Sequence, residues 1–361
     1  MRAIRLAPCV MAGLLVSMSA SFGAEWGLKE GTPEIKSAGA LAFGPDGILF
    51  VGDAKGATVF AIGTGDTKGN PSKVQLNVSG LNAKIAETLG VNADKITIND
   101  LAVNPLTGNV FLSVSKAGSA AVVKVAADGK LSHVSLAKVA FQKVELPNAP
   151  EDKEVATKRG PANLRAQSIT DLAYTEGKVY VSGVAGGSPS NVREIPFPFT
   201  DANAGTSVEI YHAAHGKVED YAVVRTFLPI NIDGEASLLA GFTCTPLVKF
   251  PVNTLKPGEK SRGSPGAELG KRNQPLDMSV YQKEGKTFLL MSNNNRGVMK
   301  ITTEGITKNP GLTEPVKVGG VAGQTYETIK ELEGVVQLDK LNSTHAVIVT
   351  SSFELRTIAL P

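Results

Sequence analysis

Short runs of alternating apolar and polar residues recur along most of this chain. In GNVFLSVS (108–115), the apolar side chains of Val110, Leu112 and Val114 fall on one face of an extended strand. Such a period of two predicts strands that bury one face. The turns PDG, LTGN and TEGK separate successive runs, and Gly in them accepts the positive φ of a tight hairpin. The pattern therefore predicts an all-β protein built from hairpins.

The hairpins repeat one unit. A short strand, a turn, a strongly apolar strand ending in small polar residues, a loop and a third strand follow one another in that order. Six copies occur, at residues 40–62, 100–125, 171–195, 236–250, 277–301 and 335–358. A fourth strand can be assigned after several copies, at residues 74–78, 133–137, 208–212 and 316–320. Four antiparallel strands repeated around a ring form a β-propeller, so we predict six four-stranded blades, with a β-sandwich as the alternative.

The last copy ends at Pro361, before a fourth strand could form. A blade without its outer strand leaves an unpaired edge, which folded proteins avoid. Residues 24–31 (AEWGLKEG) precede the first copy and have no other assignment. We therefore expect this segment to pair with the last blade and close the ring.

Residues 1–23 have the pattern of a cleaved signal peptide. Arg2 and Arg5 precede a mostly apolar run, and Ser21 and Gly23 suit cleavage before Ala24. The apolar run is too short to span a bilayer. We expect a periplasmic or secreted protein with a single propeller domain at residues 24–361 and no membrane insertion.

Charge and cysteine content narrow the function. Loss of Arg2 and Arg5 lowers the 37 Lys and Arg to 35, against 34 Asp and Glu, so the net charge becomes about +1. This argues against nucleic-acid binding, which needs concentrated basic charge. Cys9 leaves with the signal peptide, and Cys244 alone cannot form an intrachain disulfide. We expect a monomer that depends on its apolar core.

The longest insertions precede the inner strands of the blades. Residues 79–99 and 321–334 have segments that favour short helices, and residues 138–167 and 253–275 are polar and rich in Pro, Gly or charge. All four insertions belong to one face of a propeller. Loops on a rigid scaffold commonly carry function, so this face is the candidate binding surface, although simple decoration explains the insertions equally well.

Three aspartates begin inner strands at matching positions: Asp100, Asp171 and Asp277. Equivalent positions in a ring converge on the central channel, where unpaired carboxylates repel one another and bind protons more tightly. A divalent cation such as Ca²⁺, held by Asp171 and Asp277, would relieve this repulsion. The alternative is that each aspartate caps its own local turn.

The NNNRG segment supplies further candidates for ligand binding. Asn293, Asn294 and Asn295 lie between a second and a third strand and could add carbonyl oxygens, and Arg296 beside them could hold an anionic group.

The segment YHAAHG brings His212 and His215 close together in sequence. The two side chains diverge on a strand and converge on a helical turn. With Cys244 they would form a copper- or zinc-type site, although their spacing matches no strong metal signature.

The segments LAFGPDGILFVGD (41–53), DLAVNPLTGNVFLSVS (100–115) and RGVMKIT (296–302) resemble the six-bladed propeller class of NHL-repeat and gluconolactonase-like proteins. The resemblance implies a fold rather than an activity. Lactonases of this class hold a divalent metal in the central channel through Glu, Asn and Asp, and Asp171 and Asp277 fill comparable positions. The first copy begins SAGALAF, without a Glu.

The leading hypothesis is therefore a binding module for a small molecule, a glycan or a partner protein. The alternatives are a metal-dependent hydrolase of the lactonase type and a redox accessory protein with a metal at His212, His215 and Cys244.

Overall fold

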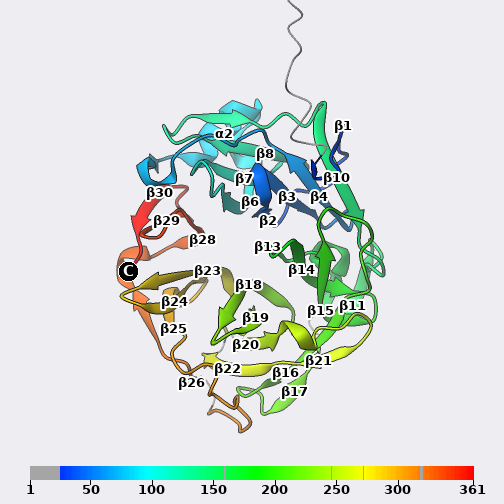
Figure 1. The fold of residues 1–361 in the computed structure, drawn as a ribbon, viewed down its shortest axis with the longest axis vertical. Coiled ribbons are helices and arrows are strands. Elements are labelled where there is room, and N and C mark those ends of the chain that lie inside the picture. The colour runs from blue at the N-terminus through cyan, green and yellow to red at the C-terminus, as the bar shows by residue number, and fades with distance from the viewer. Residues whose placement is uncertain (1–24, 158–159, 245, 271, 318–319) are drawn as a thin grey trace, which may run out of the picture.

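Six β-sheets stand around a central channel in the computed structural model, and the fold is a six-bladed β-propeller (Figure 1). The structure describes residues 25–361 except 158–159, 245, 271 and 318–319. The expected signal peptide lies outside the described residues. The propeller predicted from the repeat is confirmed, with four to five strands on the main path of each sheet.

We number the blades 1 to 6 by the sequence order of their inner strands, and the strands of each blade are given from the channel outwards. Blade 1 has β2 (Leu41–Phe43), β3 (Ile48–Asp53), β4 (Thr58–Gly63), β10 (Val139–Glu145) and β1 (Lys29–Gly31); blade 2 has β6 (Ile96–Val103), β7 (Val110–Lys116), β8 (Ser119–Val125) and β9 (Leu131–His133); blade 3 has β13 (Asp171–Thr175), β14 (Lys178–Ala185), β15 (Ser188–Pro196), β16 (Thr206–His212) and β17 (Lys217–Glu219). Blade 4 has β18 (Val224–Ile232), β19 (Glu235–Phe242), β20 (Pro246–Pro251), β22 (Ser264–Leu269) and β26 (Val321–Gly323); blade 5 has β23 (Pro275–Lys283), β24 (Lys286–Asn293), β25 (Gly297–Thr302) and β27 (Tyr326–Ile329); blade 6 has β28 (Val335–Lys340), β29 (His345–Thr350), β30 (Leu355–Ala359) and β5 (Asn77–Val78).

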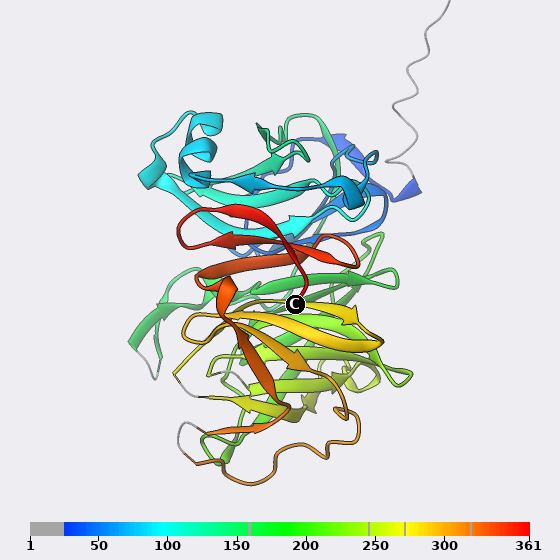
Figure 2. The same ribbon diagram turned by 90° about the vertical axis from the view of Figure 1, so that its left-hand side faces the viewer.

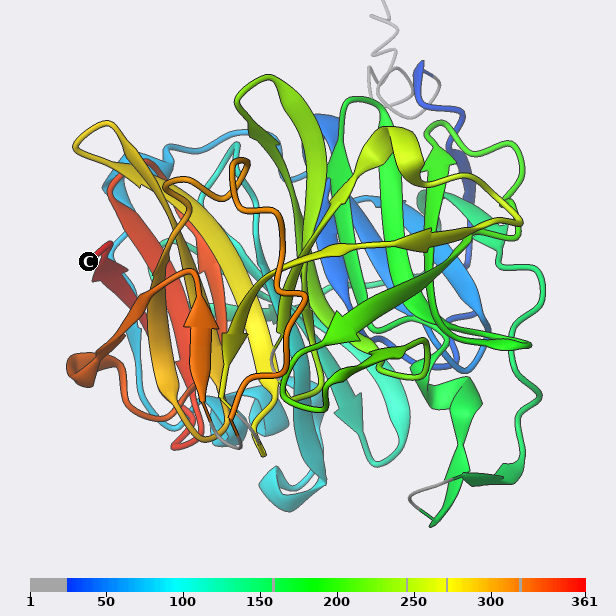
Figure 3. The ribbon, with the colours of Figure 1, turned by 90° about the horizontal axis from the view of Figure 1, so that it is seen from below.

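Three smaller elements decorate the ring. The hairpin of β11 (Glu154–Thr157) and β12 (Gly160–Asn163) projects from it (Figure 3, green, lower right). Strand β21 (Lys260–Arg262), from the insertion within blade 4, pairs in parallel with β16 of blade 3. Helix α2 (Leu81–Leu89) is an α-helix, and short 3-10 helices are found at Pro45–Gly47, Pro71–Lys73, Ala93–Lys95, Leu164–Gln167, Val252–Thr254 and Lys330–Leu332.

The order of the blades around the ring differs from their order in the sequence. Each apolar cluster fills the space between two neighbouring blades, so the clusters identify the neighbours. Leu49 and Phe111 share one cluster and join blades 1 and 2, whereas Leu112 and Val347 share another and join blades 2 and 6. The remaining clusters join blade 6 to 5, 5 to 4, 4 to 3 and 3 to 1. The ring therefore runs 2-1-3-4-5-6, with the first two blades exchanged.

This exchange requires the chain to pass from blade 1 beyond blade 2 to blade 6, and later to return from blade 2 to blade 1. After β4 the chain passes to blade 6, where β5 pairs antiparallel with β30, and then forms α2 and blade 2. After β9 it returns to blade 1 and supplies β10, which pairs with β4. Figure 2 shows the result, because the red strands of blade 6 lie directly beside the cyan strands of blade 2.

The expected closure of the ring by residues 24–31 is wrong. Strand β1 pairs with β10 at the outer edge of blade 1, and β5 completes blade 6 instead. The physical reason is burial. Val74, Leu76 and Val78 alternate with polar residues and are all buried in the cluster between blades 2 and 6, whereas Lys29–Gly31 offers no apolar side chain.

Some of the predicted insertions are blade strands. Residues 138–167 contain β10, and residues 321–334 form β26, β27 and a 3-10 turn instead of a helix. The first blade takes its fourth strand from residues 139–145, so the assignment of residues 74–78 to it is wrong. The helix expected in residues 79–99 is confirmed as α2, with Leu81, Ile85 and Leu89 buried. Residues 318–319 of the expected strand 316–320 lie outside the described residues.

Candidate functional site

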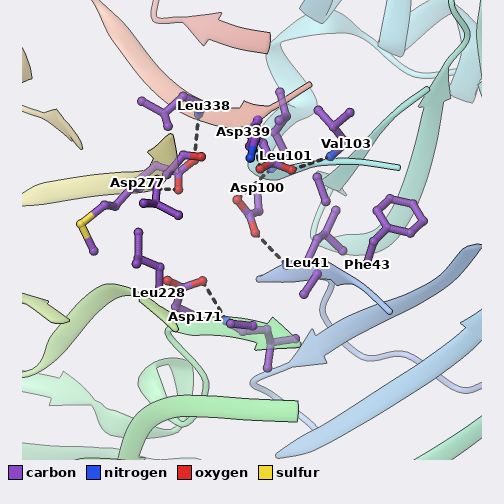
Figure 4. Close-up of a pocket in the computed structure, with 18 of the residues that line it drawn as sticks. Leu41, Phe43, Asp100, Leu101, Val103, Asp171, Leu228, Asp277, Leu338 and Asp339 are labelled. Atoms are coloured by element: carbon purple, nitrogen blue, oxygen red, sulfur yellow. Dashed lines mark hydrogen bonds between the residues drawn. The ribbon is translucent and has the colours of Figure 1, made fainter. Parts of the chain in front are cut away.

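Four aspartates from four blades surround the central channel. They are Asp100 of β6, Asp171 of β13, Asp277 of β23 and Asp339 of β28. Figure 4 shows their carboxylates converging on one space from separate strands. The sequence predicted this convergence for the first three and missed Asp339. Copies two and three begin with Asp-Leu, whereas the sixth reads Leu-Asp, so matching the copies by phrase places no aspartate there.

Local backbone irregularities accompany these side chains. The pairing of β6 with β7 shifts register between Ile98 and Asp100, and that of β23 with β24 shifts between Pro275 and Asp277. A bulge places one extra residue in a strand and re-aims the side chains that follow it. The residues Asn99 and Leu276 occupy these extra positions, immediately before an aspartate that lines the channel.

Each carboxylate links two neighbouring inner strands. One oxygen accepts the N–H of the next residue in its own strand, and the other accepts an N–H from the adjacent blade. The inter-blade donors and distances are Leu41 to Asp100 (2.7 Å), Phe227 to Asp171 (2.8 Å), Leu338 to Asp277 (2.8 Å) and Val103 to Asp339 (2.8 Å). All four links run in the same rotational sense around the ring. The expected local cap therefore exists, but it is only half of the arrangement.

Burial and mutual repulsion raise the pKa values of these groups. Burial and the neighbouring Asp171 carboxylate raise the pKa of Asp100 well above its ordinary value, and burial and Asp100 do the same to the pKa of Asp277. Burial raises the pKa of Asp171 to about 7 and that of Asp339 to about 6. The backbone N–H groups oppose these shifts without cancelling them. A cation in the channel would favour the ionised forms.

A cavity of about 370 Å³ extends from the aspartates along the inner strands. Its walls are mostly apolar, and include Leu41, Phe43, Leu101, Val103, Leu228, Met278 and Leu338. Lys340 also lines it, and the charge of Lys340 lowers the pKa of Asp339 against the effect of burial. A cavity of this size with apolar walls and a few charged groups at one place is typical of small-molecule sites.

The aspartates separate this larger cavity from the side of the ring where the inner strands begin. A second cavity of only about 60 Å³ lies at the starts themselves, lined by Asn99, Thr170, Leu276, Gln337 and the three aspartates Asp100, Asp171 and Asp277. The sequence placed the candidate surface on this side because the insertions gather there. The structure puts more space on the other side, which inner-strand residues line directly.

The asparagines and arginine predicted from NNNRG lie elsewhere. Asn293 ends β24, and Asn294, Asn295 and Arg296 follow it, between the second and third strands as expected, but these residues line neither central cavity. Asn294 accepts a hydrogen bond from the N–H of Gln274, and Asn295 donates one to the carbonyl of Arg272, so both hold the loop before β23. Asn293 donates to the side chain of Asn273. The guanidinium of Arg296 packs against Gly270, where an added Cβ would lie 2.2 Å from it.

The two histidines come together without the cysteine. His212 ends β16 and His215 lies in the following turn, where its N–H donates to the carbonyl of His212 at 3.0 Å. The turn brings both rings to Glu219 of β17, and a potential ligand atom from each of these three residues lies within 4.8 Å of the others. Cys244 lies between β19 and β20, where its N–H donates to the carbonyl of Asn273, and is not part of this group. Glu219 was missed because only the hairpin pairing brings it to the face of His212.

Comparison with known structures gives alignments of low similarity. The chain aligns with a chain of a mitotic checkpoint complex at 9% identity and a TM-score of 0.41, over 99% of both chains. It aligns with a streptogramin B lyase at 10% identity and a TM-score of 0.37, over 92% of this chain and 97% of the other. It aligns with the PQQ-bound aldose sugar dehydrogenase of Streptomyces coelicolor at 13% identity and a TM-score of 0.33, over 91% and 97%.

Sequence comparison adds no relative, because no protein-family model and no curated protein matches the chain. Within the described part of the chain, none of the helices has the length and apolar character needed to cross a bilayer.

Proposed function

We propose that this protein is a binding module that takes a small organic cation into the central cavity. The observation that carries the proposal is the ring of four aspartates at one end of an apolar cavity of about 370 Å³. An ammonium group near the carboxylates would replace their mutual repulsion with attraction. The hydrocarbon part of the ligand would lie against the apolar walls. This choice narrows the small molecule, glycan or partner protein expected from the sequence to one class.

The charge balance supports a cationic ligand over a neutral one. Four carboxylates face a channel whose lining includes Lys340 in the larger cavity and Arg225 in the smaller one. The side chain of Arg225 donates to the hydroxyl of Thr243 at 2.9 Å, so part of its hydrogen-bonding capacity is directed away from the aspartates. Each Asp oxygen accepts one backbone N–H and has a further lone pair for a ligand.

A matched series of five-carbon ligands tests the proposal. Calorimetry at pH 8 would compare 1,5-diaminopentane, 5-amino-1-pentanol, 1,5-pentanediol and pentanedioate, which share a chain length and differ in charge. We expect the diamine to bind most tightly, the amino alcohol next, and the dianion not at all. The Asp277→Asn variant should weaken the diamine at least tenfold and leave the diol unchanged. Asp128→Asn is the matched control, since Asp128 is exposed in a turn of blade 2.

Two outcomes would contradict the proposal. The first is a diol that binds as tightly as the diamine. The second is tight binding of one Ca²⁺ per chain that Asp277→Asn abolishes while the diamine does not bind. That result would make the channel a metal site and favour the lactonase-type alternative.

We further propose that the protein acts outside the cytoplasm, in the periplasm or the medium. The support is the n-region, apolar run and small residues of positions 1–23. Fractionation of cells that express the whole chain, with N-terminal sequencing of the product, tests this. A cytoplasmic product that retains Met1 or Arg2 would contradict it.

A further inference from the structure

A second cluster of ionisable side chains lies at the outer rim of the propeller, between blades 3 and 4. The rim hairpin of β16 and β17 supplies His212, His215 and Glu219, and β22 of blade 4 supplies Glu268. His212, Glu219 and Glu268 are almost fully buried, with side chains exposed by 1%, 1% and 0%, whereas His215 is 40% exposed. These residues are not among those that line the central cavities.

Glu219 is the centre of the cluster. Its two oxygens lie 2.8 Å from Nδ1 of His212 and 2.7 Å from Nδ1 of His215. Since an ionised carboxylate only accepts hydrogen bonds, both imidazoles must carry their proton on Nδ1 in this arrangement. The hydroxyl of Tyr221 donates to the same carboxylate.

The arrangement leaves two buried polar atoms without a hydrogen bond. They are Nε2 of His212 and Oε2 of Glu268, which face each other at 3.9 Å. Buried polar groups normally find partners, because an unmet donor or acceptor costs about 1–3 kcal/mol. The imidazole of His212 and the carboxyl group of Glu268 therefore face each other without a hydrogen bond between them.

We infer that His212, His215 and Glu219 form a binding site for a divalent transition-metal ion of the zinc class, with Glu268 orienting His212. The ion takes Nδ1 of each histidine and a carboxylate oxygen of Glu219, in place of the protons that these atoms share. Two imidazoles and a carboxylate are an established ligand set for zinc. His215 gives the ion access from solvent.

Metal binding also explains why Nε2 of His212 and Oε2 of Glu268 have no hydrogen bond in this structure. When Nδ1 of His212 binds a metal, its ring proton moves to Nε2, the atom that faces Glu268. Metal-binding histidines usually donate their second N–H to a carboxylate in this way. Ligand atoms about 2.0–2.1 Å from a tetrahedral ion lie roughly 3.3 Å apart, so the ring must move from Glu219 by about half an ångström. A move of the ring in the direction of Glu268 would shorten the 3.9 Å gap between Nε2 and Oε2.

Lys217 is a competing cation beside Glu219, but its side chain is exposed and can be displaced by a metal ion. Nζ of Lys217 lies 3.8 Å from Glu219, and the side chain of Lys217 is 58% exposed. An exposed lysine gains little from such a pair and can turn to solvent when an ion binds.

Titration of the metal-free full-length protein with ZnCl₂ tests the inference. We expect one Zn²⁺ per chain, and binding at least tenfold weaker in His215→Ala, an exposed position whose change should not impair folding. Glu268→Gln should weaken binding without abolishing it. His133→Ala is the matched control, because His133 is exposed on blade 2. With Co²⁺ as the probe, the visible absorption of a four-coordinate ion should form in the wild type and be lost in His215→Ala.

Three results would overturn the inference. They are no saturable Zn²⁺ binding, equal affinity in His215→Ala and the wild type, and loss of binding in Asp277→Asn while His215→Ala retains it. The last would assign the metal to the channel. A site that behaves as expected while the diamine fails to bind leaves this inference standing and removes the proposed function, so the two are separable.

Discussion

At the scale of single residues, the channel aspartates combine two roles that usually compete. Each one links two blades through backbone N–H groups, which stabilises the ionised form. Each is also buried near other carboxylates, which favours the protonated form. For Asp171 burial prevails, and the pKa reaches about 7.

This balance predicts how stability varies with pH. The folded protein binds the Asp171 proton more tightly than the unfolded chain, whose pKa is near the ordinary 3.8. The free energy of unfolding should therefore fall as the pH rises from about 4 to about 7. Asp171→Asn removes this titration, so its unfolding free energy should fall less over the same window in urea titrations. Identical slopes for the two proteins would contradict the shift. The Glu268 carboxyl group also has a raised pKa, of about 7, but it is present in both proteins and cancels in the comparison.

At the scale of elements, the strand that completes blade 6 matters more than its length suggests. Strand β5 has two residues, yet Leu76 before it is 4% exposed, and the N–H of Leu76 donates to the hydroxyl of Thr357 at 3.0 Å. Strand β1 has three residues with two exposed side chains. Burial, not the number of ladder hydrogen bonds, decides which segment holds the ring closed.

Leu76→Ala should lower the free energy of unfolding by about 2–4 kcal/mol, since it removes a buried side chain between two blades. Lys29→Ala in β1 should change it by less than about 0.5 kcal/mol. Chemical denaturation of both variants measures this. Equal effects would mean that β5 does not close the ring.

The predictable part of the fold was local. Alternation, turn residues and the repeated phrase identified most second and third strands, because those features depend on neighbouring residues. Strand β18 was missed since VRTFLPINI lacks the Asp-Leu phrase of the other inner strands. The destinations of β5 and β10 depend on which distant edge each buries against, and no local pattern encodes that.

The sequence likewise predicts some residues of the candidate sites and misses others. Asp100, Asp171 and Asp277 were found because they occupy matching places in the repeat. In the sixth copy Gln337 occupies the matching place and Asp339 lies two residues further on. Glu268 approaches His212 only because blades 3 and 4 are neighbours. The asparagines of residues 293–295 matched the right loop, but a sequence does not show that their side chains are used to hold the adjacent loop.

At the scale of the whole molecule, the exchange of the first two blades links distant segments of the chain in blade 6 and in blade 1. Blade 6 needs a strand from residues before blade 2, and blade 1 needs a strand from residues after it. The long-range pairs hold both joints, so neither blade has an open edge there. The channel geometry, and with it the aspartate ring, depends on these joints.

An engineered disulfide tests this topology. In a Cys244→Ala background, the pair Asn77→Cys with Arg356→Cys should oxidise readily, because the two residues are paired in β5 and β30. Paired strand residues lie within the range of Cα separations that disulfides need. The pair Lys29→Cys with Arg356→Cys represents closure by the N-terminal strand and should stay reduced. The reverse result, read by thiol counting and non-reducing electrophoresis, would restore the simpler closure.

The most direct test of the central claim is the affinity of 1,5-diaminopentane for the wild-type protein at pH 5 and at pH 8. The diamine is a dication at both values, since alkylammonium groups lose protons near pH 10. Asp171 and Asp339, with pKa values of about 7 and about 6, are mostly ionised at the higher pH and mostly protonated at the lower one. We predict binding at least tenfold tighter at pH 8, whereas equal affinity at the two pH values, or tighter binding at pH 5, would contradict a carboxylate site in the channel.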